Sequence, residues 1–509
     1  MPVRHAASLT VIAATLALAG CGGEEETRRA GDPAAQGAEG SAADALAALG
    51  LAEKSRASWE SMTQDGDTYT FTSFTLATDE GVLSAETLIL TDPRMSEQGP
   101  VFERFALSAG DLVYDEGLAR FASFALSEAG PGVGQALANF MTGQGGLDDI
   151  PLERQTFSEL TLDTLQIETE AGEDMGPGEL VIALVEASGF DGETLERFTL
   201  TDLAYDASNA DGEQVAIDIG EVAASGVNVE LLQSGAEGDM GAAPLGSLTG
   251  GFDQYETVSV SGLRLVAGGL RVLMLEFGAE VEERRGGTLV STAAMPVLTL
   301  DPNPDSANAA GFADALSRLG YEEMVFSLAS EAEYDPGEDR VTSTGENYVA
   351  MEDGFLLAFQ QDLSGIEAYA DALADWAEGQ DFETKDGEQA PTPPAEIYAP
   401  LMVHSAEIRL EDRSLIDRAL TMMAEQQGTT PAQLRAQAEL FVAMGAAMAG
   451  EAVPQALLTQ LSGALTSFIG QGGALIVEFE PQAPVSAARL VEGGADDLDG
   501  LSVRHEPAE

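Results

Sequence analysis

The run Thr68–Asp92 constrains the fold of this chain most strongly. Within Thr68–Ala77, aromatic, β-branched and Leu side chains alternate with small or polar ones, which is the period of a β-strand. Asp79-Glu80-Gly81 interrupts the pattern, and a second apolar run follows. A short turn that contains Gly between two alternating runs is typical of a β-hairpin. The stretch therefore predicts two antiparallel strands joined by a tight turn.

Similar units recur along the chain. Phe102–Leu126 turns at Asp115-Glu116-Gly117, and comparable patterns follow at Phe157–Glu170 and Leu195–Leu232. The irregular spacing of these copies argues against a solenoid and favours a meander. We therefore expect an α+β fold dominated by β-structure: a meandering, curved antiparallel sheet with packing helices and a helix-rich C-terminal part. A short form, an aromatic or Leu followed two residues later by Leu, marks five strands: Phe74–Leu76, Phe105–Leu107, Leu160–Leu162, Phe198–Leu200 and Leu263–Leu265.

Helical spacing of apolar residues predicts helices between and after the strands. Thr430-Pro431-Ala432-Gln433 is a capping box with Pro at the first helical position, so a helix should begin there. By their helical spacing, Leu434, Phe441, Met444 and Met448 would lie on its apolar face. Met at helical spacing is usually a core residue, so we expect this face to be buried. The predicted helices are Asp44–Met62, Pro131–Met141, Ser306–Leu319, Ile366–Glu378, Ser414–Gln427, Thr430–Ala449 and Pro454–Ile469.

Changes in composition divide the chain into six segments. The stretch 381–400 is rich in Pro and charge, which is typical of a linker, and a Tyr-Asp motif before a Gly-Glu turn occurs at both Tyr205 and Tyr334. The segments are a signal peptide (1–20), a flexible tether (21–43), a β-meander region (44–300), a helix with a duplicated β-meander (301–380), the linker (381–400) and a helical C-terminal region with flanking strands (401–509).

The N-terminus has the pattern of an export signal. Arg4 precedes the apolar run Leu9–Ala19, which is too short to span a bilayer as a mature helix. The run ends in Leu18-Ala19-Gly20-Cys21, which resembles the lipobox of bacterial lipoproteins. The resemblance implies a diacylglyceryl group on the Cys21 sulfur, cleavage before Cys21 and acylation of the new N-terminus. An ordinary signal peptide with an accidental Cys is the alternative.

The same resemblance implies a location in the cell envelope. Gly22 occupies the position at which Asp would retain a lipoprotein in the inner membrane, so the outer membrane is favoured. The folded part would then lie in the periplasm, held to the membrane by the N-terminal lipid.

Charge excludes several kinds of partner. The formal net charge is −64, and only two of the 23 cationic side chains are Lys. Nucleic acid and anionic lipid surfaces both need a basic patch, so neither is an expected partner. A solvated acidic surface, or weak binding of cations and basic peptides, fits this balance.

No constellation of residues indicates catalysis. Cys21 is the single cysteine, and neither a G-x-S-x-G motif nor a phosphate-binding loop is present. His404 lies in a predicted strand and His505 near the chain end, so both are expected to be structural. We expect no catalytic residue, no cofactor and no transition-metal site. Weak calcium candidates crowd one loop, where a water-solvated acidic turn is the simpler interpretation: Asp206, Asn209, Asp211 and Glu213.

The C-terminal half, from Met324 through Ser486, resembles a group of uncharacterised bacterial envelope proteins, which implies no mechanism. The leading hypothesis is a non-enzymatic, lipid-anchored envelope protein that binds acyl chains or a partner protein on a curved sheet. The first alternative is an acidic scaffold lipoprotein that engages basic partners or cations. The second is a hydrolase with a carboxylate site, for which no particular pair among the 87 acidic residues can be singled out.

Overall fold

A computed structural model describes residues 40–78, 81–114, 117–144, 150–169, 175–209, 213–229, 252, 254–306, 308–378, 393–448, 454–492 and 498–508. The chain divides into two compact units, which we describe separately. Unit 1 comprises Met1–Gly238 with Asp253–Gly268, and unit 2 comprises Asp239–Phe252 with Gly269–Glu509. Antiparallel strands dominate both units, which confirms the predicted α+β class with a β-dominated meander.

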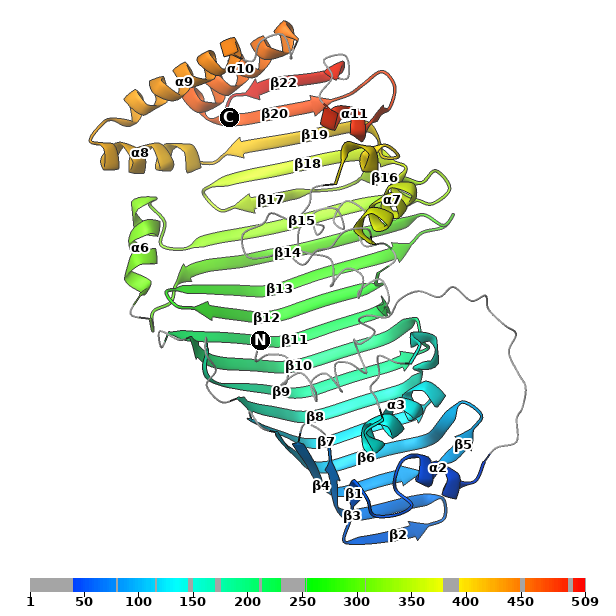
Figure 1. The fold of residues 1–509 in the computed structure, drawn as a ribbon. Helices are drawn as coiled ribbons and strands as arrows, with labels where there is room; N and C mark the ends of the chain where they lie inside the picture. Colours follow the sequence, from blue (N-terminus) through cyan, green and yellow to red (C-terminus); the bar gives the residue numbers. More distant parts are fainter. Residues whose placement is uncertain are drawn as a thin grey trace. The chain divides into compact units, whose positions relative to one another are not determined.

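Unit 1 is an antiparallel meander whose long strands pair in chain order (Figure 1). The first predicted hairpin is present as β3 and β4, and the second as β6 and β7. Short strands β1 and β2 both pair with β3, and β5 pairs with β6. The bounds are β1 Ala57–Ser58, β2 Ser61–Asp65, β3 Thr68–Ala77, β4 Gly81–Thr91, β5 Arg94–Ser96, β6 Gly99–Tyr114, β7 Gly117–Ala129, β8 Phe157–Thr169, β9 Met175–Phe190, β10 Thr194–Asn209, β11 Gln214–Asn228 and β12 Thr257–Ala267.

The inward side chains of these strands do not follow a simple alternation. On β8 the buried residues are Phe157, Leu160, Leu162, Leu165 and Ile167, so the spacing is three, two, three, two. A spacing of three means that two successive side chains face outward before the strand turns inward again. The neighbouring strands β6, β7 and β9 have the same change of phase in their burial patterns.

Left-handed backbone conformations mark where the phase changes. Five of them lie on alternate strands at one level of the sheet, and we call this level the first bulge line. A second bulge line, formed by Glu128, Gly189 and Gly226, crosses β7, β9 and β11 at another level. The first bulge line consists of Ser73 on β3, Ala109 on β6, Thr164 on β8, Asp202 on β10 and Gly262 on β12, with φ between 47° and 67°.

The bulge lines leave the strand register intact. Thr72 pairs with Thr87 and Phe74 with Ala85, so β3 and β4 each carry one unpaired residue between the same two rungs. On β7 and β8 the unpaired residues are Ala122 and Thr164, which lie between the paired residues Phe121–Leu165 and Ser123–Asp163. Because every strand carries the additional residue at the same level, the ladder continues in step and one face stays apolar throughout.

Two helices cover part of the apolar face of unit 1. α3 (Pro131–Thr142) begins at the predicted residue and packs against β6 and β7. α2 (Ala42–Ala48) has a capping box between Ser41 and Asp44 and is much shorter than the predicted helix Asp44–Met62. The prediction was wrong beyond Leu49, because Gly50 adopts a left-handed conformation and the following residues enter β1 and β2.

Unit 2 is a second antiparallel meander. The predicted duplicate of β10–β12 is present, but two short strands, β16 and β17, both pair with β15 and replace a single middle strand. The buried Asn347 side chain fixes the connection between them, because it accepts from the Glu331 amide at 2.8 Å and donates to the Thr344 carbonyl at 2.8 Å. The bounds are β13 Leu270–Glu283, β14 Leu289–Pro302, β15 Met324–Asp335, β16 Arg340–Ser343, β17 Tyr348–Met351, β18 Phe355–Ser364, β19 Met402–Asp412, β20 Gly473–Phe479, β21 Val485–Ser486 and β22 Leu501–Glu506.

The helices of unit 2 follow the predicted signals closely at their ends. The capping box at the start of α9 is formed, since the Gln433 amide donates to Thr430 Oγ1 and the Thr430 amide donates to Gln433 Oε1. α8 ends at Gly428, whose φ is 64°, whereas α10 continues past Gly470 to Gly472. The bounds are α6 Ala309–Arg318, α7 Ile366–Glu378, α8 Leu415–Gln427, α9 Pro431–Met448, α10 Gln455–Gln471 and α11 Ala487–Glu492, with short 3-10 turns at Leu152–Arg154 in unit 1 and Ala395–Tyr398 in unit 2.

The predicted apolar face of α9 is only partly buried. Leu434 is buried as expected, but Phe441 is 71% exposed and Met444 is 49% exposed. The expectation that these side chains are core residues was wrong. α9 packs against α8 and α10, and Leu434 is its one fully buried residue among those whose side chains are described.

Candidate apolar binding surface

Cross-strand pairing in unit 2 sorts its side chains onto two faces. Directly paired residues share a face. One row begins at Met295 on β14 and ends at Leu475 on β20. Its members are Met295, Leu328, Val349, Leu357, Leu410 and Leu475, each paired with the next. A second row on the same face contains the pair Phe359 and Ile408. We call this face the apolar face of unit 2.

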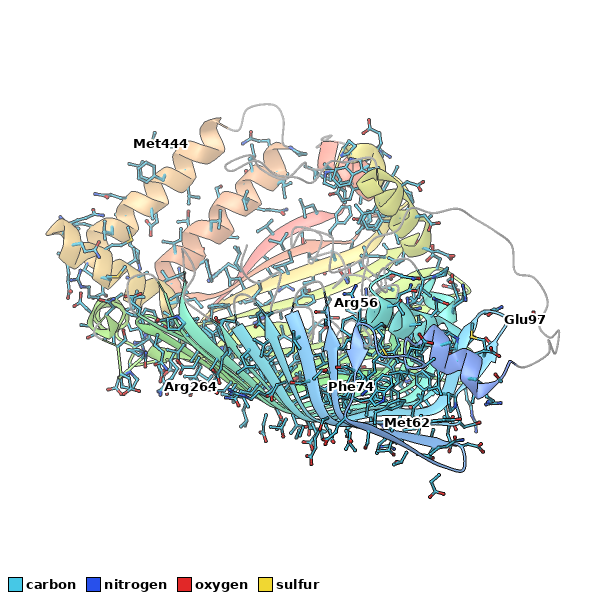
Figure 2. The ribbon with its side chains drawn as sticks, turned by 60° about the horizontal axis from the view of Figure 1, so that its bottom comes forward. Arg56, Met62, Phe74, Glu97, Arg264 and Met444 are labelled. Atoms are coloured by element: carbon cyan, nitrogen blue, oxygen red, sulfur yellow. The ribbon has the colours of Figure 1, made fainter. Side chains whose placement is uncertain are left out.

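Helices cover the apolar face near the ends of its strands. Toward one end, α6 packs Leu316 against Phe326 and Met351. Toward the other end, Tyr369 of α7 packs with Val341 and Leu363. α10 covers the β20–β22 side through Leu457 and Ala464. In Figure 2 the helices α7 and α10 lie on one side of the strands β18, β19 and β20.

The middle of the apolar face lies between these three clusters. Five residues of the first row, all except Leu475, belong to none of the hydrophobic clusters formed by the described residues. Their side chains are partly exposed, and Ile408 in the second row is 50% exposed. A central strip of the face therefore presents large apolar side chains that no described helix buries.

The strip is long in one direction. The uncovered part of its first row crosses five strands, from β14 to β19, and neighbouring strands are about 4.8 Å apart, so it measures roughly 19 Å. The acyl region of one bilayer leaflet is about 15 Å thick. The uncovered row is therefore longer than the acyl region of one leaflet is thick.

The opposite face of unit 2 is polar and carries paired Arg and carboxylate side chains. Arg340 donates to Asp362 through Nε at 2.6 Å and through Nη2 at 2.5 Å, a bidentate pair that leaves the Asp362 side chain 18% exposed. The hydrogen bonds from Arg340 hold the pKa of Asp362 below its usual value. Arg409 binds Glu506 at 2.6 Å and lowers the pKa of that carboxyl in the same way. The two faces thus differ sharply in chemistry.

On the polar face His404 is hydrogen-bonded to Ser364, a pair of residue types that can act in nucleophilic catalysis. His404 Nε2 is 2.8 Å from Ser364 Oγ, which is the spacing of a nucleophile and its base. The nearby Asp362 carboxylate is held by Arg340, and among the described residues no carboxylate binds the other ring nitrogen of His404. Without that acceptor the imidazole lacks the orienting group of a Ser-His-Asp triad.

The predicted lipidation residue Cys21 and the three lipobox residues before it, Leu18, Ala19 and Gly20, lie outside the described residues. No helix within the described ranges has both the length and the apolar character needed to cross a membrane.

Only two of the four calcium candidates, Asp206 and Glu213, have side chains in the part of the chain that the structure describes. Asp206 accepts a hydrogen bond from Gln214 at 2.8 Å across the β10–β11 hairpin, and Glu213 lies beside Gly268. Asp211 lies outside the described residues, as does the side chain of Asn209. Among the described residues, no three Asp, Glu, His or Cys side chains gather as metal ligands would.

The described residues define a β-dominated α+β protein made of antiparallel meanders with helices on one face. A family model described as "Uncharacterized protein" matches residues 348–505, from β17 to β22. The match falls on the C-terminal region for which the sequence indicated a resemblance to uncharacterised bacterial proteins. No curated protein matches the chain.

The sequence did not indicate the apolar strip as a site. Its residues lie on five strands spread over more than a hundred residues of the chain, and each has the sequence of an ordinary strand. What distinguishes them is that no helix in the described part of unit 2 covers them, which only the positions of α6, α7 and α10 reveal.

Proposed function

We propose that this chain is a non-enzymatic, lipid-anchored protein of the cell envelope that binds an acyl chain on the apolar face of unit 2. The anchor would be the lipidated Cys21, with the outer membrane as the favoured location and the folded units in the periplasm. The ligand would lie across the strands, along the row from Met295 to Leu410.

One observation carries the binding proposal: a row of large apolar side chains from Met295 to Leu410, about 19 Å long by strand spacing, stays partly exposed between three helix-covered clusters. Contiguous apolar surface of this kind on a soluble protein usually marks a binding site. The ligand must be apolar along its length, because the row contains no charged or hydrogen-bonding side chain. An extended acyl chain meets this requirement.

The test is binding of a fluorescent fatty acid, cis-parinaric acid, to the full chain with Cys21→Ser, followed by displacement with palmitate. Leu357→Gln places an amide in the middle of the row. Binding would bury the introduced amide without a hydrogen-bond partner, which costs about 1–3 kcal/mol, so the affinity should fall by roughly tenfold.

Leu356→Gln is the matched control, because Leu356 pairs with Glu411 on the opposite, polar face of the same strand. It should leave the affinity unchanged. Equal loss in both variants, or no binding of the probe by the parent chain, would refute the proposal. Capture of basic proteins that is lost at modest salt would favour the acidic-scaffold alternative instead.

A further inference from the structure

The C-terminal half of α9 is apolar and exposed. Leu440 is 59% exposed, Phe441 71% and Met444 49%. We call these three residues the α9 patch. The stretch Leu440–Met448 contains no ionisable residue, although 22% of the chain is charged. Figure 2 labels Met444, which marks the position of the α9 patch.

The position of α9 explains why the patch is uncovered. α9 packs against α8 and α10, and α10 in turn packs against β20 and β22. α9 therefore forms an outer layer over unit 2, with Leu434 buried near its start and the α9 patch exposed in its second half. No element in the described part of unit 2 covers these large apolar side chains, and exposed apolar side chains of this kind mark interaction sites.

We propose that the α9 patch inserts into the surface of an uncharged lipid bilayer. This inference deepens the proposed function, because it brings the apolar face of unit 2 next to a source of acyl chains, and it relies on the proposed anchor for its strength. An interfacial helix inserts its apolar side chains among the lipid headgroups and the first acyl carbons. Leu, Met and Phe are suited to that position.

Charge decides which lipid surface fits. A chain with a net charge of −64 is repelled by an anionic surface, and the second half of α9 has no Lys or Arg to offset the repulsion. A zwitterionic surface has neither obstacle. Insertion should therefore depend on apolar burial alone and be insensitive to salt.

Size decides against a second copy of the chain. Side chains of about 200 Å² each, exposed to the stated degrees, present roughly 400 Å² in total. A stable protein interface needs about 800 Å² on each partner. Two copies would also bring together two charges of −64. A bilayer needs no matching surface, and a lipid anchor raises the effective concentration so that a small patch contributes.

The experiment measures flotation of the full chain with Cys21→Ser on phosphatidylcholine vesicles, with lipid up to the millimolar range. Phe441→Ser together with Met444→Ser should lower the partition coefficient by at least about tenfold. Ala436→Ser together with Gln437→Ser, two exposed positions on the same helix, is the matched control and should change nothing.

A second variant gives a direct readout. Phe441→Trp should show a blue shift of Trp emission when neutral vesicles are added, because the indole enters a less polar medium. Partition that falls with salt, concentration-dependent dimers that the Ser variant abolishes, or no partition and no blue shift would overturn the inference. Fatty-acid binding and its loss in Leu357→Gln are measured without vesicles, so failure of the α9 patch and failure of the proposed ligand site are distinguishable.

Discussion

Deletion of Thr164 tests the role of the first bulge line. Thr164 is the additional residue of β8, between the rungs formed by Asp163 and Leu165. Without it, the second half of β8 can regain its pairing with β7 and β9 only if Gln166 and Glu168 take the inward places of Leu165 and Ile167. A one-residue slip always exchanges the two faces of a strand.

The expected loss of stability is large. Leu165 is 1% exposed and Ile167 is 2% exposed, so expelling both removes about 3–6 kcal/mol of apolar burial. Burying the Glu168 carboxylate among apolar side chains adds several kcal/mol more. Domains have only about 5–15 kcal/mol of stability in total. The deletion should therefore prevent unit 1 from folding or lower its urea midpoint drastically.

The chain offers a convenient reporter for each unit. Its two tryptophans are Trp59, which packs edge-on against Phe71 in unit 1, and Trp376, which lies on α7 in unit 2. In a Trp376→Phe background, fluorescence during urea unfolding follows unit 1 alone. The matched control is Thr164→Gly, which keeps the residue count and relieves a φ of 50° that costs a non-Gly residue about 1 kcal/mol. An unchanged midpoint in the deletion variant would refute the reasoning.

Two further predictions concern the polar face of unit 2. Asp362→Asn should lower the free energy of unfolding by about 1 kcal/mol at pH 7, because it weakens a partly exposed bidentate pair with Arg340. Since the pKa of Asp362 is lowered in the folded state, this contribution to stability is complete above the unfolded pKa of about 3.9 and is lost as the pH falls through the folded pKa. Urea unfolding of the parent and the variant, followed by Trp376 fluorescence, should therefore give free energies of unfolding that converge in strong acid. A difference that stays constant with pH would contradict the assignment. A serine-reactive fluorophosphonate should leave Ser364 unlabelled, because His404 lacks a carboxylate partner in the part of the chain that the structure describes. Mass spectrometry of the peptide that contains Ser364 measures the labelling. Labelling in the parent chain that is lost in His404→Ala would show that Ser364 is a reactive serine and would contradict the prediction.

Much of the fold was predictable because its signals are local. The Gly-containing turns before Gly81 and Gly117 and the capping box at Thr430 each depend on a few neighbouring residues, and each led to the correct element. The bulge lines were missed, although the sequence carries them. Phe71, Phe74 and Leu76, or Phe102, Phe105 and Leu107, show a spacing of three and then two, which a search for strict alternation reads as a shorter strand.

The exposed half of α9 was not predictable in the same way. Its composition is that of a buried helix, and composition predicts burial only when the fold supplies a neighbour. Here α10 lies between α9 and the strands, so among the described residues Phe441 and Met444 have no neighbour that buries them. The predicted helix Asp44–Met62 was too long for a related reason. Ala57–Ser58 and Ser61–Asp65 pair with β3 and therefore form strands.

The bulge lines also bear on how such a chain can change its length. Each hairpin of unit 1 brings its own pair of additional residues, so its two edges match the edges of any other hairpin built in the same way. A whole hairpin can then be gained or lost without disturbing the strands on either side, whereas a single strand cannot, because its removal would reverse the direction of the chain. The width of the sheet is in this sense a modular property, adjustable in steps of two strands.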